Sequence, residues 1–314
     1  MKTAHWSILG SGVTGLCVAT TLASHGESIE VIEDSSQISA SHFAGGMLAP
    51  YCESELAPTV AQQGLESIHW WQQHTPEVVQ KGSLVLASGR DYTELKRFAS
   101  RTTRHQWVSP QDLEMDLSHL QHGLFFPVEA HLDPRRALHH LRQQLINRGV
   151  PFHQGKAQGK MVDCRGYAAQ PLLSDLRAVR GEMLRIRQPE LNITRPIRLL
   201  HPRFPCYLVP RKNEEYMLGA TMIESHDTGS IHVRSMMELL SALYTIHPAF
   251  AEAEIIETGV GLRPAYPSNL PKIDYQHGRF LINGMHRHGF LCAPLLAEQF
   301  IQQLQGKTPH AAFY

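Results

Sequence analysis

The sequence predicts a mixed fold, α/β plus α+β, in which a Rossmann-like nucleotide-binding domain is interrupted by a β-rich domain. Three observations support this prediction. Residues 6–33 have the pattern of a strand, a glycine-rich turn, a helix and a second strand. From about residue 180 onward, short strands joined by polar turns follow one another. From about residue 255, the pattern returns to strand, glycine and helix.

The composition is that of a folded, soluble protein. Of the 314 residues, 42% are hydrophobic and 18% are charged, which is too apolar for a disordered chain. Lys and Arg balance Asp and Glu at 29 each, so no bulk charge attracts nucleic acid or an anionic membrane. No apolar run approaches the roughly 18–20 residues of a membrane span, and no signal peptide is visible. We expect a cytoplasmic protein.

Cysteine and histidine spacing does not indicate a metal site. The five cysteines lie far apart and form no Cys-x-x-Cys pair, which argues against both a zinc site and a disulfide framework. The 20 histidines form no His-x-x-x-His or His-Glu-x-x-His pattern. We therefore expect free thiols and no metal.

The first glycine-rich turn has the form that binds the pyrophosphate of a dinucleotide. It follows an apolar predicted strand, 6–9, and opens a predicted helix that ends just before Gly26. Gly10 allows the tight turn, and Gly12 lets the backbone approach the pyrophosphate. Gly15 lets the helix pack closely against the strand. This complete context makes nucleotide binding the favoured interpretation over a tight turn without a ligand.

Further residues around the turn fit the same role. Val13 and Thr14 lie at the predicted helix N-terminus, where free N–H groups bind phosphate. Glu33 ends the predicted strand 28–33, about 20 residues after the glycines, and would accept hydrogen bonds from a ribose hydroxyl.

The motif alone does not decide between NAD and FAD. No second complete motif is present, because Pro264 stands where the third glycine after Gly259 and Gly261 would belong. One site leaves two options: an NAD-dependent dehydrogenase, or a flavoprotein that is reoxidised by something other than a nicotinamide.

The remaining elements follow from local signals. Asp133 and Pro134 are a favourable helix start, and Gly149 is a helix end. The segment 44–50 is a flexible loop that permits close backbone approach. The other predicted elements are helices 54–74, 134–148, 233–246 and 289–305 and strands 82–87, 150–152, 183–186, 206–209, 216–220, 280–283 and one ending at 261–264.

Several motifs in order along the chain resemble a known family. They are the fingerprint 10–15 with Glu33, and the stretches 44–50, 130–134, 179–183, 207–211, 219–221, 261–264 and 283–290. Together they resemble the FAD-dependent amino-acid oxidases of the D-amino-acid oxidase superfamily, and within it the glycine oxidases of thiamine biosynthesis (ThiO-like). The resemblance covers nearly the whole chain.

This resemblance implies a discontinuous FAD-binding domain and a β-rich substrate domain. The FAD-binding domain would comprise 1–50, 130–178 and 255–314, and the substrate-binding domain 51–129 and 179–254. It also implies a non-covalent FAD and the oxidation of glycine, or a similar small amino acid or amine, to an imine. Oxygen would be reduced to hydrogen peroxide. A thiazole-synthase partner and a homo-oligomer are further expectations.

The resemblance also implies site residues. Arg263 would hold the substrate carboxylate, Tyr207 would assist with its hydroxyl, and Arg287 would lie beside the flavin. From the residues alone, the better-supported roles are a surface or structural ion pair for Arg263 and a half-buried strand residue for Tyr207. The resemblance favours the substrate-binding role for both. The implied cofactor contacts are Gly10, Gly12, Val13, Thr14, Gly15, Glu33, Gly45, Gly46, Met47, Leu48, Gly284, His288, Gly289, Phe290 and Leu291.

Two departures and several alternatives stay open. The segment 152–163 is shorter than in the family, and 163–169 replaces a Thr-Gly-Ala-Trp type motif, so FAD contacts and FAD affinity are expected to differ there. The substrate could instead be sarcosine, a D-amino acid or a residue on a partner protein. A different class of function would be an NAD-dependent dehydrogenase or a non-catalytic nucleotide-binding protein. Cys292 is expected in the core rather than as a covalent flavin anchor.

Overall fold

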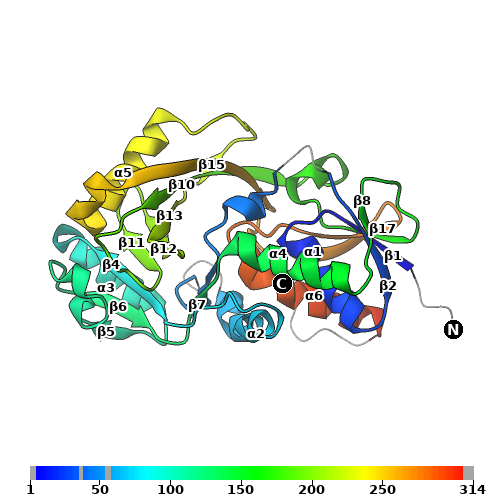
Figure 1. Ribbon diagram of the computed structural model, residues 1–314, viewed down its shortest axis with the longest axis horizontal. Coiled ribbons are helices and arrows are strands. Elements are labelled where there is room, and N and C mark those ends of the chain that lie inside the picture. Colours follow the sequence, from blue (N-terminus) through cyan, green and yellow to red (C-terminus); the bar gives the residue numbers. More distant parts are fainter. Residues whose placement is uncertain (1–4, 35–37, 54–57, 307–314) are drawn as a thin grey trace.

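A computed structural model describes residues 5–34, 38–53 and 58–306. Two large sheets lie side by side, and the long strands β10 (Arg177–Arg187) and β15 (Glu254–Ala265) run along the top of the molecule (Figure 1). A six-stranded sheet lies in one half and a nine-stranded sheet in the other. The predicted combination of α/β and α+β structure is therefore confirmed.

The six-stranded sheet brings together strands from three distant parts of the chain. Its order is β16-β17-β9-β1-β2-β8. The central strands β1, β2 and β9 are parallel, as in a nucleotide-binding sheet, and β16 is antiparallel to β17. The strands are β1 His5–Leu9, β2 Ser28–Ile32, β8 Phe152–His153, β9 Lys160–Asp163, β16 Lys272–Gln276 and β17 Arg279–Asn283.

Three helices pack in this half of the molecule (Figure 1). They are α1 Val13–Ser24, α4 Pro134–Asn147 and α6 Gly289–Leu304. Helix α1 is buried along most of its length between its neighbours, which explains why its apolar residues are not confined to one face. The predicted helices are confirmed here, and Cys292 of α6 is fully buried, as expected.

The ends of α4 follow the predicted signals. Asp133 caps the helix by accepting hydrogen bonds from the backbone N–H groups of Arg135 and Arg136. Gly149 has a φ of +81°, the left-handed conformation that ends helices. The backbone N–H of Val150 donates to the carbonyl of Leu145, 3.0 Å away, and so extends the helix-terminating turn. For this reason the next strand is β8, Phe152–His153, rather than 150–152.

A buried carboxylate anchors the short segment between β8 and β9. Glu30 of β2 accepts hydrogen bonds from the backbone N–H of Gln158 at 2.8 Å and from the hydroxyl of Ser7 at 2.5 Å. Its other oxygen lies 2.9 Å from the imidazole Nε2 of His153. These contacts hold the 152–163 segment against the sheet.

The nine-stranded sheet forms the other half. Its order is β14-β10-β13-β12-β11-β4-β6-β5, and β15 pairs with β10. The range predicted for the FAD-binding domain begins at 255, yet β15 pairs antiparallel with β10 of this sheet. The domain division stays a prediction. The other strands are β4 Ser83–Ala87, β5 Gln106–Val108, β6 Gly123–Phe126, β11 Ile197–Leu200, β12 Cys206–Pro210, β13 Glu215–Gly219 and β14 Ile223–Glu224.

Some elements differ from the sequence prediction. The loop 44–50 contains the two-residue strand β3 (Met47–Leu48), which pairs with β7 (Ala130–His131). Helix α2 is described from Pro58 to His74, and its predicted start at 54 lies outside the described residues. Helix α5, Val233–Ile246, matches the prediction, whereas α3, Tyr92–Arg101, was not predicted. Tyr92, Leu95, Phe98 and Ala99 of α3 pack at helical spacing on the core, a pattern that the sequence prediction missed.

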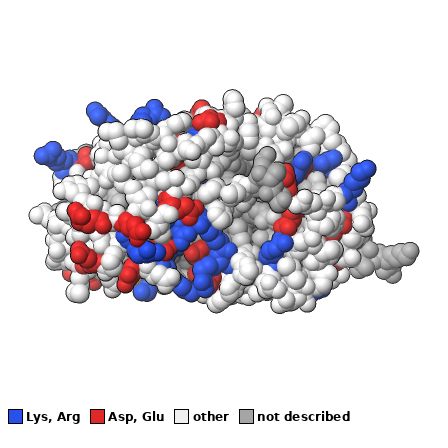
Figure 2. Space-filling model, turned by 45° about the horizontal axis from the view of Figure 1, so that its top comes forward, with Lys and Arg blue, Asp and Glu red and all other residues white. Residues whose placement is uncertain are grey.

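Other features concern the whole described chain. No described helix is long and apolar enough to cross a membrane. All five cysteines are buried and unpaired. Across residues 5–34, 38–53 and 58–306, no cluster of three or more metal-ligating side chains occurs. Positive and negative side chains are intermixed on the face shown in Figure 2.

Candidate active site

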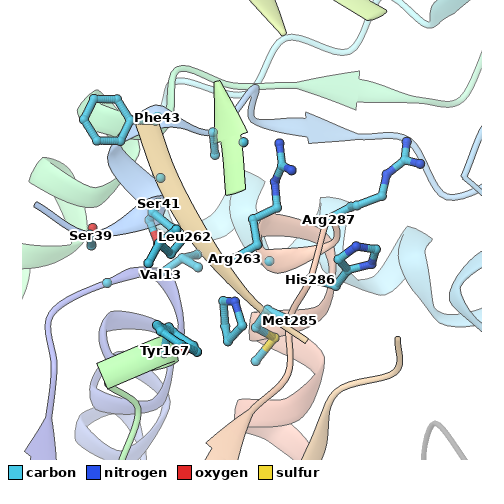
Figure 3. A pocket seen from close by; sticks show the side chains of 18 of the residues that line it. Val13, Ser39, Ser41, Phe43, Tyr167, Leu262, Arg263, Met285, His286 and Arg287 are labelled. Atoms are coloured by element: carbon cyan, nitrogen blue, oxygen red, sulfur yellow. Dashed lines mark hydrogen bonds between the residues drawn. The ribbon is translucent and has the colours of Figure 1, made fainter. Parts of the chain in front are cut away.

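A cavity of about 1330 Å³ extends between the two sheets. One end is lined by the first glycine-rich turn, and the other by Tyr207, Arg263 and Arg287. Figure 3 shows Arg263 on β15 and Arg287 in the loop before α6, with Val13 and Ser41 nearby. The volume exceeds the roughly 300–1,000 Å³ of most small-molecule pockets, so it fits a dinucleotide together with a substrate.

The glycine turn forms a close cradle at the start of α1. Gly10 has a φ of +99°, which a residue with a side chain rarely adopts. A Cβ atom at Gly15 would lie 1.8 Å from the carbonyl oxygen of Gly10, so only glycine permits this packing of helix on strand. Gly12 and Thr14 line the cavity, and the backbone N–H of Val13 donates to Oγ of Ser41, 3.0 Å away. The cradle fits a pyrophosphate.

Glu33 and the segment after β9 line the same end of the cavity. Glu33 follows β2 and forms an ion pair with Arg142 of α4. The cavity wall also includes residues 164–168, part of the segment 163–169 that is predicted to differ from the family. Asp163, at the end of β9, is buried and pairs with Arg165 at 2.6 Å. Of the two segments predicted to differ from the family, 163–169 therefore lies beside the nucleotide cradle, whereas no residue of 152–163 lines the cavity.

The segment 44–50, which contains β3 and predicted cofactor contacts, lies at the cavity. Gly45, Gly46 and Met47 line the cavity, whereas Leu48 points into the core. Gly46 has a φ of +71°, and a Cβ atom there would lie 2.2 Å from the carbonyl oxygen of Leu132. The glycine is therefore required by the backbone itself.

Helix α6 begins at the cavity wall. His288, Gly289, Phe290 and Leu291 line the cavity, so the positive end of the helix dipole is directed there. Gly284 does not line it and has a φ of +84°. Gly15 likewise packs behind the cavity wall, so Gly15, Leu48 and Gly284 lie outside the lining while the other predicted cofactor residues belong to it.

Arg263 is a cation without an ion-pair partner among the described carboxylates. Its Nη1 donates to the backbone carbonyl of Thr221 at 2.9 Å. Burial lowers the pKa of Arg263 to about 10, and the positive charge of Arg287 adds to this. The guanidinium therefore stays charged at pH 7 and can bind an anionic group of a ligand.

Arg287 belongs to a tight cluster with Tyr207 and Glu53. The hydroxyl of Tyr207 donates to Glu53, and Nη2 of Arg287 lies 2.6 Å from that hydroxyl and 3.1 Å from Oε2 of Glu53. Burial would raise the pKa of Glu53, but Arg287 and Arg198 outweigh it and lower the pKa to about 2. Burial also raises the pKa of Tyr207 well above its usual value, so the phenol is neutral.

Two histidines beside this cluster are neutral at pH 7. Burial lowers the pKa of His286 to about 3, and the charges of Arg263 and Arg287 contribute. Burial lowers the pKa of His288 to about 4 even though its Nδ1 lies 3.7 Å from Glu53. Neither imidazole is therefore a charged partner for an anionic ligand at neutral pH.

The sequence prediction missed Glu53 and Arg198. Glu53 lies in a turn after the predicted flavin loop and carried no motif signal. Arg198 lies in the apolar strand β11 and donates to the carbonyl of Cys52 at 2.6 Å. A charged residue inside an otherwise apolar strand was an available signal for a buried functional arginine. The three predicted catalytic residues do come together in this cavity.

Known proteins resemble this chain in sequence and in fold. The family model described as FAD dependent oxidoreductase matches residues 5–303. A Rhizobium etli protein assigned as the thiamine biosynthesis oxidoreductase ThiO is 47% identical over 310 residues, which cover 94% of each chain. The bifunctional ThiO/ThiG protein of Trichormus variabilis is 25% identical over 92% of this chain and 51% of its own length. A glycine oxidase structure from Bacillus cereus matches with a TM-score of 0.83 and 21% identity over 98% of this chain and 99% of that chain.

Proposed function

Because this chain belongs to the family of FAD-dependent oxidoreductases, we propose that it oxidises glycine or a similar small amino acid. The observation that carries the proposal is Arg263, a charged guanidinium without a described carboxylate partner in the same cavity as the nucleotide cradle. Such a group binds the carboxylate of a small substrate. The similarity to the Rhizobium etli thiamine biosynthesis oxidoreductase supports an oxidation that serves thiamine synthesis.

The proposed reaction converts the Cα–N bond of the substrate into an imine. In this reaction the substrate loses a hydride from Cα and a proton from its amine; bound FAD would supply the hydride-accepting chemistry, and oxygen would take up the electron pair and two protons to give hydrogen peroxide. Water then hydrolyses the imine to an oxo acid and ammonia. For glycine, the oxo acid is glyoxylate.

The residues of the chain would act mainly by placing the substrate. Arg263 would bind its carboxylate, and Tyr207, whose phenol burial keeps protonated, would turn its hydroxyl from Glu53 to the substrate. Arg287 would hold Tyr207 in place through the contact at 2.6 Å. Hydride transfer depends on placement more than on an acid–base pair, so the lack of a dedicated base is consistent with the proposal.

FAD would be held without a covalent bond. The pyrophosphate would lie at the start of α1, the ribose near Glu33, and the flavin between the loop 45–47 and the start of α6. The helix dipole of α6 would stabilise negative charge on the flavin. In this proposal the FAD-binding unit comprises 1–50, 130–178 and 255–314, and 51–129 and 179–254 form the substrate side.

A role in making the thiazole of thiamine and an interaction with a thiazole synthase belong to the same proposal. The bifunctional ThiO/ThiG relative joins the two named parts in one chain, whereas this chain matches only about half of it. A homo-oligomer in the cytoplasm is also proposed. Size-exclusion chromatography with light scattering, with and without a thiazole synthase, would test both associations.

The visible spectrum under nitrogen tests the reaction directly. The FAD-saturated protein is recorded before and after glycine, and then after oxygen is admitted. Bleaching by glycine, followed by recovery and peroxide formation, would support the proposal. A flavin band that glycine leaves unchanged would contradict the glycine substrate, and sarcosine, D-alanine and a peptide amine would then be tested in the same way.

A further inference from the structure

The substrate end of the cavity holds two neighbouring arginines. Arg263 of β15 and Arg287 of the loop before α6 extend in the same direction in Figure 3. Their guanidinium groups are close enough for the charge of Arg287 to lower the pKa of Arg263. Two adjacent cations ordinarily favour a ligand with two negative groups. The surroundings of the two arginines, however, differ.

Only Arg263 is left without a described carboxylate partner. Arg287 places Nη2 at 3.1 Å from Oε2 and 3.3 Å from Oε1 of Glu53. Arg263 instead donates to the carbonyl of Thr221. Within the described ranges, no carboxylate lies within 4.0 Å of its guanidinium. The charge of Arg287 is thus already balanced inside the protein, and that of Arg263 is not.

Glu53 is held firmly in this position. Its side chain is buried and contacts the hydroxyl of Tyr207, the guanidinium of Arg287 and, at 3.7 Å, the imidazole of His288. The preceding backbone N–H of Cys52 donates to the buried carboxyl group of Glu129 at 2.7 Å. These contacts leave the carboxylate little freedom to move aside for a ligand.

We propose that Glu53 is a specificity-determining residue that restricts this site to ligands with a single carboxylate. A dicarboxylate bound to Arg263 would bring its second negative group toward Arg287, where Glu53 already lies. The two negative groups would repel each other in a buried setting, which is costly. The inference rests on the proposed function, because it assumes that Arg263 binds the substrate carboxylate.

Calorimetric titration of the FAD-saturated protein with acetate and malonate tests this inference at constant ionic strength. Malonate is acetate with one further carboxylate. The ratio of the two affinities therefore measures how much the second negative charge strengthens or weakens binding. The wild-type protein should bind malonate no more tightly than acetate. In Glu53→Gln, Arg287 loses its ion-pair partner. The affinity for malonate should then rise tenfold or more relative to that for acetate. Glu257→Gln is the matched control, since Glu257 pairs with Arg135 and Arg185 outside the cavity lining.

The double variant Glu53→Gln with Arg287→Gln identifies the source of the gain. The relative gain for malonate should disappear there. The inference is wrong if the wild-type protein already prefers malonate tenfold, if Glu53→Gln leaves the ratio unchanged, or if the gain persists without Arg287. If Glu53→Gln does not retain FAD, Glu53→Ala is used in its place. Because binding is measured without turnover, a failure of glycine oxidation would leave this result readable.

Discussion

The guanidinium of Arg263 lies directly over the backbone of Gly181. A Cβ atom built on Gly181 would lie 2.3 Å from Nη2 of Arg263. The two residues belong to the paired strands β15 and β10, in which Gly181 lies opposite Gly261 and Arg263 opposite Val179. The missing side chain at position 181 therefore creates the space in which the proposed carboxylate-binding arginine extends.

Gly181→Ala should weaken substrate binding without unfolding the protein. The added methyl group meets the end of a flexible side chain, so Arg263 would move rather than the strand. We expect the KM for glycine to rise about tenfold, since charged hydrogen bonds contribute about 1.5–3 kcal/mol each. FAD content and thermal stability would change little. An unchanged KM would show that substrate binding does not depend on the placement of the Arg263 guanidinium over Gly181.

Arg263→Ala removes the proposed carboxylate partner altogether. Glycine binding should weaken by one to two orders of magnitude, from the loss of a charged hydrogen bond worth about 1.5–3 kcal/mol, while FAD remains bound. Steady-state kinetics at saturating FAD measure the effect. Arg187→Ala is a suitable control because Arg187 pairs with Glu254 and Glu215 and does not line the cavity. Normal glycine kinetics in Arg263→Ala would disprove the assignment.

Comparing Glu33→Gln with Arg142→Gln distinguishes a ribose-binding role of Glu33 from its ion pair with Arg142. Glu33 pairs with Arg142, so loss of FAD affinity could arise from either contact. If Glu33 binds the ribose, Glu33→Gln should raise the FAD Kd about tenfold, and Arg142→Gln should have a smaller effect. FAD fluorescence titration gives both values. Equal losses in the two variants would point to the ion pair instead, and a loss of turnover at saturating FAD would contradict the ribose role.

Glu129 should make stability depend on pH. Its carboxyl group is buried and accepts hydrogen bonds from the backbone N–H groups of Tyr51 and Cys52. Burial raises its pKa from the usual value of 4.5 to about 8. The folded state therefore binds this proton more tightly, and its stabilising effect is lost as pH rises from about 4.5 through about 8.

Glu129→Gln tests this expectation because an amide stays neutral. The free energy of unfolding of the wild-type protein should decline across that pH range by a few kcal/mol more than that of the variant, on the order expected for such a shift. Urea denaturation at several pH values provides the comparison. Parallel pH profiles for the two proteins would mean that Glu129 is already ionised in the folded state.

Gly15→Ala should disrupt the nucleotide cradle. The new Cβ atom would lie 1.8 Å from the carbonyl oxygen of Gly10, so the backbone of the turn must shift. Loss of bound FAD and a lower Tm are expected. Gly89→Ala is the control, because a Cβ atom there meets nothing within 4 Å. Retention of FAD by Gly15→Ala at the wild-type level would contradict the close packing described here.

Local signals predicted the elements around the cofactor end. Gly10, Gly26 and Gly149 have positive φ values that side chains disfavour, and Asp133 caps α4 as its sequence position indicated. These signals act within a few residues, so they are readable from the chain. Strands of two to four residues gave too little periodicity to be found, whereas the apolar spacing of α3 was readable and was missed.

By itself, the sequence determined the nucleotide cradle, the order of the main elements and, through the family resemblance, the cofactor. Only the tertiary structure decided that Glu53 shares a cluster with Tyr207 and Arg287, which lie 154 and 234 positions away along the chain. It likewise left Arg263 without a described carboxylate partner. The physical reason is that burial and charge pairing depend on which strands and loops pack together, and no local pattern encodes that packing.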